Sequence, residues 1–367
     1  MNKEDNILII IPSLTLGGAE KQALEYTKSL KRLGYSPIIL GLGKEGGMIN
    51  KLKDLEIEYK TYSFKGFFKA KKIKQLFFLL KFIFFVRSLN CKTGISFTYW
   101  PNVIFKLIYP FCGIKKIYWN QRSVDSISQP IFWERLSKNI KVNYIANSLA
   151  SARSIAKKHS VSKNDIHVIY NVMDLSPSTI INQEKNTIDI IMVANFFEEK
   201  DHFTLIYAFQ KLVSQHSNLD LKLHLVGTVP GGSDRLIDAK ALAFDLGLSD
   251  RVIFHGLVID MKMILTQMDI GVLSTFSEGF SNAIMEYMEA GLPVVASAIE
   301  SNLEALTDLN KEFLFEVENV NELVNKLELF ILDENLRKEV GMKNSEIAQN
   351  SFHIHNLDIS LKQLLKD

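Results

Sequence analysis

The sequence predicts an α/β protein of two doubly wound domains, each a parallel sheet with helices on both faces. Three observations lead to this prediction. The chain has 367 residues, more than a single hydrophobic core usually organises. Short apolar runs alternate with amphipathic stretches along the chain. A polar segment rich in turn-forming residues, 174–187, interrupts this alternation, which then starts again.

The first half opens with an aliphatic run that is typical of a buried strand. Acidic residues lie beside the lysine before it and the run is short, so we expect a first strand here rather than a signal peptide. A helix at 18–34 follows, with apolar residues at helical spacing and Gly34 at its end. The strands expected in this half are 6–12, 36–43, 115–120, 142–148 and 165–171.

The second half repeats the pattern. Strands are expected at 188–195, 221–227, 251–256 and 269–274, and helices at 202–216, 234–247 and 261–267. A further helix should end at Gly291 and Pro293, before the apolar run 294–296. We therefore expect a first domain at 1–178, a second at 179–352, and a C-terminal helix at 353–367 that crosses back to the first.

Composition narrows the class of protein. Hydrophobic residues make up 47% and charged residues 23%, which is typical of a globular protein. The two cysteines, Cys91 and Cys112, have no metal-binding or redox spacing, and so few suggest a reducing compartment. No apolar run approaches the ~18–20 residues of a transmembrane helix. We expect a cytoplasmic protein.

The charge is unevenly distributed. Residues 59–124 hold 13 Lys/Arg and no Asp/Glu, although the whole chain has a net charge of only +2. The segment 64–89 combines lysines with eight phenylalanines. Such a helix can lie on an anionic membrane surface, or it can be a core helix whose lysines extend to water. No nucleic-acid-binding motif accompanies it. We expect membrane contact, on the inner face of the cell membrane.

Two loops after strands have residues suited to phosphate. Gly17 and Gly18 stand where the first strand turns into its helix, so a ligand could approach the backbone. Lys200 lies in the loop before the helix 202–216, where an ammonium group could neutralise phosphate. Each has an alternative interpretation without a ligand. Gly17 and Gly18 would form an ordinary turn between a strand and a helix, and Lys200 would be a solvated surface lysine.

Two glutamates flank a helix start between Ser277 and Ser297. Glu278 precedes the helix and Glu286 lies within it, with Gly279 between them. Exposed acids on a helix are common, and Glu289 fits that interpretation. Acid–base chemistry would need a shifted pKa that no sequence feature identifies. Binding vicinal hydroxyl groups needs only ionised carboxylates.

These residues resemble a known family. The pattern S-x-x-x-E-G-F-S-N-A-x-x-E-x-x-x-A-G-x-P-V-V-A, which contains Glu278 and Glu286, is similar to the signature of retaining family 4 glycosyltransferases of bacterial polysaccharide and lipid-linked saccharide synthesis. The resemblance covers nearly the whole chain. The other matching segments are LGGAE (16–20), IANS (145–148), VIYNVMD (168–174), VANFFEEKDH (193–202), LVG (225–227) and FHG (254–256). It implies the GT-B fold, two Rossmann-like domains facing across a cleft.

The resemblance also implies roles in donor binding. Glu286 would accept the ribose hydroxyls of a nucleotide diphosphate sugar, with UDP the expected carrier, and Glu278 would face the sugar hydroxyls. Lys200 would neutralise the departing diphosphate. The other donor-side residues are Gly17 and Gly18 at the phosphates, Gly279, Phe280, Ser281 and Asn282 at the helix start, and Gly256 and Leu257 at the base.

The chain departs from the family pattern at three places. Asn195 stands where many members have an arginine. The loop 118–125 contains no histidine, so Asn120, Arg122 and Asp125 become the acceptor-side candidates, with Arg122 in a catalytic role. The segment 298–306 has no glycine pair. No Asp-x-Asp triplet occurs, which favours metal-independent catalysis without a further cofactor.

The sequence thus predicts transfer of a sugar to a saccharide or lipid-linked saccharide. Two alternatives remain open: a sugar-nucleotide 2-epimerase on the same fold, and a non-catalytic partner subunit that binds nucleotide sugars. A dehydrogenase is disfavoured, because no G-x-G-x-x-G opens the first helix.

Overall fold

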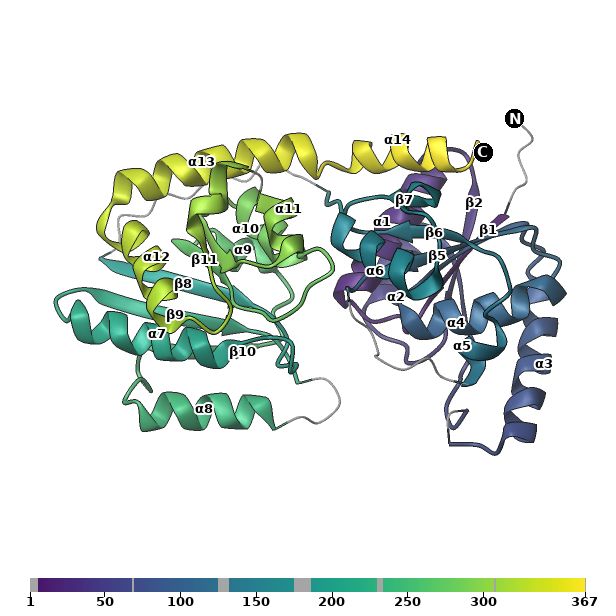
Figure 1. The fold of residues 1–367 in the computed structure, drawn as a ribbon, viewed down its shortest axis with the longest axis horizontal. Helices are drawn as coiled ribbons and strands as arrows, with labels where there is room; N and C mark the ends of the chain where they lie inside the picture. Colours follow the sequence, from purple (N-terminus) through teal and green to yellow (C-terminus); the bar gives the residue numbers. More distant parts are fainter. Residues whose placement is uncertain are drawn as a thin grey trace. The chain divides into compact units, whose positions relative to one another are not determined.

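The computed structural model describes residues 6–67, 69–124, 132–174, 186–229, 234–306 and 308–366. The chain forms two compact units. Unit 1 comprises Met1–Asp174 and Ile354–Asp367, and unit 2 comprises Leu175–His353. Figure 1 shows a sheet with flanking helices in each unit. The chain therefore passes between the units twice, once after Asp174 and once after His353.

Unit 1 contains a seven-stranded parallel sheet in the order β3-β2-β1-β4-β5-β6-β7. Its strands are β1 (Asn6–Ile11), β2 (Ser36–Gly41), β3 (Glu58–Thr61), β4 (Thr93–Phe97), β5 (Lys116–Gln121), β6 (Asn143–Ala146) and β7 (Ile166–Val168). Neighbours continue outward in both directions from the β1–β4 pair, which makes this pair the topological switch point.

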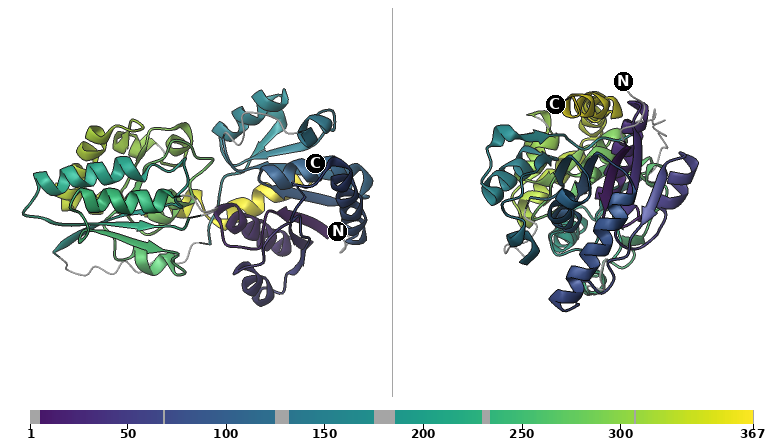
Figure 2. Two further views of the ribbon diagram at one scale, coloured as in Figure 1. Left: turned by 90° about the horizontal axis from the view of Figure 1, so that it is seen from below. Right: turned by 90° about the vertical axis from the view of Figure 1, so that its right-hand side faces the viewer.

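Helices cover both faces of this sheet because the strand side chains alternate. Ile7, Ile9 and Ile11 pack with α1, α2 and α14, whereas Leu8 and Ile10 pack with α3, α4, α5 and α6. The helices are α1 (Gly18–Arg32), α2 (Met48–Asp54), α3 (Lys72–Ser88), α4 (Tyr99–Ile108), α5 (Phe132–Leu136), α6 (Leu149–His159) and α14 (Ile354–Leu364). The C-terminal helix α14 lies beside α1 (Figure 2).

Unit 2 contains a six-stranded parallel sheet in the order β10-β9-β8-β11-β12-β13, with its switch point between β8 and β11. The strands are β8 (Thr187–Val193), β9 (Asp220–Val226), β10 (Val252–Gly256), β11 (Ile270–Leu273), β12 (Val294–Ser297) and β13 (Leu314–Phe315). The helices are α7 (His202–Gln215), α8 (Arg235–Asp245), α9 (Met261–Leu265), α10 (Asn282–Glu289), α11 (Glu300–Leu306), α12 (Val320–Leu332) and α13 (Glu334–Ser351). The predicted fold class is confirmed: both sheets are parallel and carry helices.

Helix α10 is fixed against the sheet by one tyrosine. The hydroxyl of Tyr287 accepts a hydrogen bond from the Val193 amide at 2.6 Å and donates to the Val272 carbonyl at 3.3 Å. The ring lies over Gly271, where a Cβ atom would come within 2.5 Å of it. The helix ends at Gly291, which has φ +73°. These contacts set the position of the residues before and within α10.

Helix α3 is apolar on two opposite faces. Leu79, Phe82 and Val86 are buried in the core. The other face carries a stripe of apolar side chains that are 43–71% exposed, namely Ile73, Leu76, Phe77, Leu80 and Phe84. Within the described residues, no helix has both the length and the apolar character to span a bilayer.

Candidate functional site

Lys200 and Glu278 meet at the carboxyl ends of β8 and β11. The loops after these strands form a backbone bridge between Lys200 and Thr275. The Phe276 amide donates to the Glu199 carbonyl at 2.9 Å. This bridge brings the Lys200 ammonium and the Glu278 carboxylate into an ion pair. Their side chains are 16% and 22% exposed, so both can reach a ligand.

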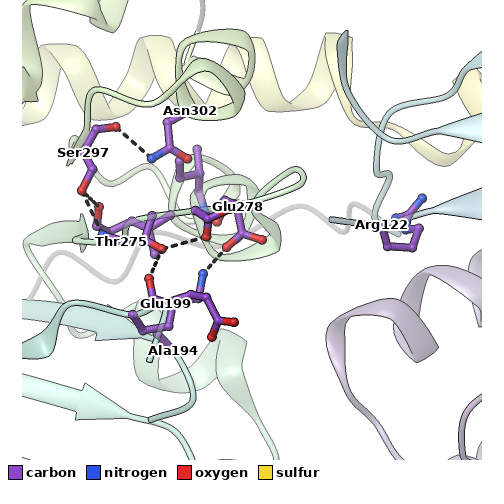
Figure 3. A network of polar contacts seen from close by, with 12 residues as sticks. Arg122, Ala194, Glu199, Thr275, Glu278, Ser297 and Asn302 are labelled. Carbon is purple, nitrogen blue, oxygen red and sulfur yellow. Dashed lines mark hydrogen bonds and ion pairs between the residues drawn. The ribbon is translucent and has the colours of Figure 1, made fainter. Parts of the chain in front are cut away.

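A polar network holds the second of these loops in place (Figure 3). The Thr275 hydroxyl donates to the Glu199 carbonyl at 2.7 Å, and the Thr275 amide donates to Ser297 Oγ at 2.9 Å. The side-chain amide of Asn302 donates to the Ser297 carbonyl at 3.0 Å. Sequence reasoning missed Thr275, Ser297 and Asn302. A short polar residue directly after each buried strand was the only available signal.

The start of α10 offers backbone donors near this pair. Ser281 caps the helix, because its hydroxyl accepts from the Ile284 amide at 3.2 Å. The Phe280 side chain is buried and packs edge-on against Phe352, so only its backbone can face a ligand. Gly279 is also buried. Asn282 and Glu286 lie one turn apart, and both are partly exposed.

The expectation for Glu289 was wrong. Its side chain is 5% exposed and forms an ion pair with Lys262 at 2.8 Å. It lies three residues after Glu286 on α10, yet it points into the protein because α9 covers that side of the helix. Glu286 is thus the carboxylate of this helix that remains accessible.

Asn195 joins the ends of two strands. Its Oδ1 accepts hydrogen bonds from the amide and the hydroxyl of Thr228, at 2.8 and 2.9 Å. Gly227 is required beside it, because a Cβ there would lie 2.0 Å from the Ala194 carbonyl oxygen. The side-chain oxygen of Asn195 is therefore already used within the protein.

His202 packs against the loop that carries Lys200. Its ring stacks on Phe196 with centroids 4.1 Å apart, and its nitrogens lie 3.3 Å from the carbonyl oxygens of Ala194 and Lys200. Burial lowers the pKa of His202 to about 4. The ring is therefore neutral at physiological pH, and its role is to hold the loop.

Gly256 and Leu257 follow the edge strand β10. Gly256 has φ +67°, a conformation that residues other than glycine rarely adopt. Leu257 is 77% exposed. An apolar side chain held open in this way is available to a planar ligand such as a nucleobase.

In unit 1, Gly17 is the N-terminal cap of α1, and Gly18 is the first residue of the helix. A carboxylate already occupies this helix start. A Cβ on Gly17 would lie 2.5 Å from Oε2 of Glu20, whose Oε1 accepts a hydrogen bond from Ser13 at 3.2 Å. Burial raises the pKa of Glu20. Packing of Glu20 is thus a second reason for glycine at position 17.

The acceptor-side candidates lie at the end of β5. Asn120 is fully buried. Arg122 donates to Asn171 and lies over the Phe97 ring, 5.9 Å from its centroid, while its Nη1 is buried without a hydrogen-bond partner among the described residues. Burial lowers the pKa of Arg122 to about 10. Asp125 lies outside the described residues. Figure 3 also shows Arg122.

Metal ligands are not grouped in the described part of the chain. No cluster of three or more His, Cys, Asp or Glu side chains there could hold a metal ion. The Lys200 ammonium and the amides at the start of α10 are suited to phosphate charge.

Comparison with known proteins finds a family model that matches part of the chain. Residues 178–346, somewhat under half of the chain, match the model described as glycosyl transferases group 1. Protein CapJ of Staphylococcus aureus is 24% identical over 341 residues, which cover 87% of this chain and 82% of CapJ. An N-acetylgalactosamine-N,N'-diacetylbacillosaminyl-diphospho-undecaprenol 4-alpha-N-acetylgalactosaminyltransferase of Campylobacter jejuni is 23% identical over 312 residues, covering 80% of this chain and 82% of that enzyme.

A solved structure extends the comparison to the fold of the whole chain. HepE of Anabaena, solved in complex with UDP and glucose, has a TM-score of 0.84 and 21% identity, and the match covers 98% of this chain and 99% of HepE. This shared two-sheet architecture shows that the chain has the GT-B fold, and the part of it at 178–346 is similar to the glycosyl transferases of group 1.

Proposed function

We propose that this protein is a glycosyltransferase that transfers a sugar from a nucleotide diphosphate sugar, with UDP as carrier, to a saccharide or lipid-linked saccharide, with retention of configuration and without a metal ion. The observation that carries the proposal is the Lys200–Glu278 pair at the switch point of unit 2, beside the start of α10. A cation, helix-start amides and an accessible carboxylate are together what a sugar diphosphate needs.

The chemistry assigned to this site is electrostatic. The bond between sugar C1 and the diphosphate oxygen breaks, and Lys200 and the amides of Gly279 and Phe280 stabilise the negative charge that develops on the leaving group. The acceptor oxygen forms a bond to C1 on the same face. Its proton passes to the departing phosphate oxygen, so that the products are the glycoside and the free nucleotide diphosphate.

The carboxylates bind hydroxyl groups in this proposal. Glu286 accepts from the ribose and Glu278 accepts from the sugar. When the diphosphate engages Lys200, Glu278 exchanges its ionic partner for sugar hydroxyls. Ser281 supports the site by capping α10. Asn282 lies one turn before Glu286, on the diphosphate side, and Leu257 contacts the base.

Some of the proposed residue roles are based on the family resemblance. Gly17 and Gly18 are assigned to the phosphates, and Asn120, Arg122 and Asp125 to the acceptor. For Arg122, the unpartnered Nη1 adds support, because a buried guanidinium gains from a ligand that accepts hydrogen bonds. Asn195 does not replace the family's arginine as a phosphate ligand through Oδ1, which Thr228 already engages.

The names of similar proteins support the choice of substrates. HepE was solved with UDP and glucose, which supports a UDP-linked donor. The Campylobacter jejuni enzyme is named for a diphospho-undecaprenol acceptor, which supports a lipid-linked saccharide. We propose the same classes of substrate for this chain.

We also propose that the enzyme binds peripherally to the inner face of the cell membrane through 64–89. The exposed stripe of α3 supports this, since Phe77 and Phe84 are 62% and 71% exposed. Lys71, Lys74 and Lys81 are exposed on the same helix and its cap. An apolar face next to cations fits an anionic lipid surface.

A donor screen tests the proposal. Nucleotide sugars are added one at a time, thermal unfolding identifies the ligand that stabilises the protein, and that donor is incubated with and without saccharide acceptors. Acceptor-dependent release of UDP is expected, with an α-linked product from an α-linked donor and no effect of EDTA. Conversion of the donor without acceptor would indicate an epimerase instead. Binding without turnover would indicate a non-catalytic subunit.

A further inference from the structure

Unit 1 contains a basic cavity whose cationic side chains have no role in the proposed reaction. Its volume is about 1180 Å³, and the segments around it are α4, α5, the connection 138–143, α6 with the residues after it, and the end of β5 with the loop after it, where Gln121 and Val124 line it. Six cationic side chains line it against two acidic ones, Glu134 and Asp165. The cations are Lys106, Arg135, Lys138, Lys141, Lys157 and Lys158.

Lys106 is the buried member of this set. Its side chain is 3% exposed, and its ammonium lies over the Trp119 ring at 5.8 Å from the centroid. No residue in the described part of the chain forms a hydrogen bond or ion pair with it. Burial lowers the pKa of Lys106, and Glu134 opposes that shift. Because the residue lines the cavity, its ammonium group is available to an anionic ligand.

Glu134, one of the two acidic side chains that line the cavity, makes its contacts with other groups. Oε2 accepts from the Tyr99 hydroxyl at 2.5 Å, and Oε1 pairs with Lys158 at 3.1 Å. Lys158 also lies over the Tyr99 ring, 4.6 Å from its centroid. The site therefore keeps a surplus of positive charge around Lys106.

His159 adds a neutral polar group to the same wall. Burial and the nearby charges of Lys106 and Lys158 lower its pKa to about 4, against the opposing effect of Glu134. Its ring lies against Trp119 and Tyr144, with centroids 4.9 and 5.1 Å away. A neutral imidazole can donate one hydrogen bond to an anion without adding charge.

We propose that this cavity binds a ligand bearing a phosphate or diphosphate group, with Lys106 at its buried end and Lys138, Lys141, Lys157 and Lys158 around the opening. Several convergent ammonium groups suit the multiple negative oxygens of phosphate better than a single carboxylate. Trp119 and Tyr144 are 1% and 5% exposed, so no aromatic surface is available for stacking nucleic-acid bases. The ligand is a soluble phosphorylated compound or a phospholipid headgroup.

The inference goes beyond the proposed function, because binding here requires neither donor nor acceptor. Inorganic diphosphate is the probe, and isothermal titration calorimetry measures its affinity for the full-length protein. Lys106→Met replaces the ammonium by an apolar group of similar shape. Lys115→Met is the matched control, since Lys115 is exposed in the same unit and does not line the cavity.

The expected result is a diphosphate affinity at least about tenfold weaker in Lys106→Met and unchanged in Lys115→Met. The thermal midpoint of Lys106→Met without ligand should equal or exceed that of the wild type, because a buried ammonium has been removed. A purely structural lysine would instead lower the midpoint. If Lys106→Met fails to fold, Lys138→Gln with Lys157→Gln, both at exposed positions, should weaken diphosphate binding in its place.

Vesicles that contain phosphatidic acid distinguish the two sources of phosphate. Loss of vesicle binding in Lys106→Met assigns the site to a lipid headgroup. Equal vesicle binding by both proteins, with diphosphate affinity lost in Lys106→Met, assigns it to a soluble compound. The proposal would be overturned if the cavity variants bound diphosphate and the vesicles as tightly as the wild type does. It would also be overturned if the wild type bound neither of these two probes.

Discussion

The Lys200 ammonium and the Glu278 carboxylate form an ion pair between the loop after β8 and the loop after β11. Glu278 therefore competes with any anionic ligand for Lys200, and Lys200 competes with any hydrogen-bond donor for Glu278. In the proposed function, a diphosphate that binds Lys200 weakens this pair, and Glu278 then accepts from hydroxyl donors. A sugar joined to the diphosphate would supply those donors, so the proposal predicts tighter binding of an intact nucleotide sugar than of its separate parts.

Replacing Lys200 by alanine should impair catalysis. The leaving diphosphate loses its cationic partner, and turnover should fall by about 10²–10³, the range for removing one group that stabilises transition-state charge. The assay is UDP release with saturating donor and acceptor. Lys338→Ala, at an exposed position on α13, serves as the control and should retain full activity. Near-normal turnover of Lys200→Ala would contradict the role of this residue.

Replacing Glu278 by glutamine should separate nucleotide binding from transfer. Lys200 loses its competing carboxylate, so the affinity for UDP should rise by about two- to fivefold. Sugar transfer should fall at the same time, because the sugar hydroxyls lose an ionised acceptor. Calorimetry with UDP and a turnover assay measure the two effects. Unchanged or weaker UDP binding would show that the pair does not compete with phosphate.

Two glutamates of α10 provide a matched comparison. Glu286→Ala should weaken UDP binding by about tenfold or more, through loss of hydrogen bonds to a charged group. Glu289→Gln breaks the buried pair with Lys262 and should lower the thermal midpoint while UDP affinity stays the same. The two variants lie three residues apart on one helix. Equal UDP affinity in wild type and Glu286→Ala would remove the ribose assignment.

His202 should make unit 2 sensitive to acid. Its pKa is about 4 in the folded protein, below the ordinary 6.5 of the unfolded chain. The contribution of His202 to the free energy of unfolding is fully present above pH 6.5. It declines between pH 6.5 and 4, because in this range His202 takes up a proton in the unfolded state but not in the folded state. The loss over this window is on the order of 3 kcal/mol.

The variant His202→Phe keeps a ring on Phe196 and removes this titration. Urea unfolding by circular dichroism at pH 7 and pH 5 should show a smaller loss of stability for the variant than for the wild type. His159, whose pKa is also about 4, is present in both proteins, so its contribution cancels. Equal losses would mean that His202 is not the group responsible.

The exposed face of α3 should determine membrane affinity. Phe77→Ser with Phe84→Ser removes two exposed rings, each contributing up to about 1.5–3 kcal/mol if fully buried in lipid, and vesicle binding should fall by at least about tenfold. Phe244→Ser in α8, where the ring is 73% exposed, is the control and should bind vesicles normally. Flotation with anionic vesicles is the measurement. Replacing Lys71, Lys74 and Lys81 by glutamate should give a similar loss at low ionic strength, because anionic lipid repels the added carboxylates, and salt should lessen this loss.

Strands such as β1 and β8 were predictable because buried parallel strands contain aliphatic runs, as at 7–11 and 190–193. The short strands β3 and β4 were not among the expected strands. The break after α10 was predictable from Gly291, since its positive φ suits glycine. The exposed stripe of α3 was not predictable from the sequence. Apolar residues on both faces remove the periodicity that distinguishes a buried side from an exposed one.

The site was predictable in its residue types but not in its contacts. Glu278 and Glu286 stood out through their spacing, whereas their ionic partners depend on packing between distant segments. The pairing of Lys200 with Glu278 follows from the backbone bridge to Thr275, which no local pattern encodes. Burial of Glu289 depends on packing of α10 against α9. The sequence predicts a helix at 261–267 but not the helix against which it packs.

The last helix has a consequence for how the protein is made. Leu357, Leu361 and Leu364 of α14 are buried in the core of unit 1, and the Tyr118 hydroxyl donates to the Leu364 carbonyl at 2.8 Å. Unit 2 is one continuous segment, so it can fold as soon as it leaves the ribosome. Unit 1 is discontinuous, and its first segment is synthesised before unit 2 whereas α14 is synthesised after it. The core of unit 1 therefore stays open until α14 has been made, and a chain that stops before α14 would leave an uncovered aliphatic surface.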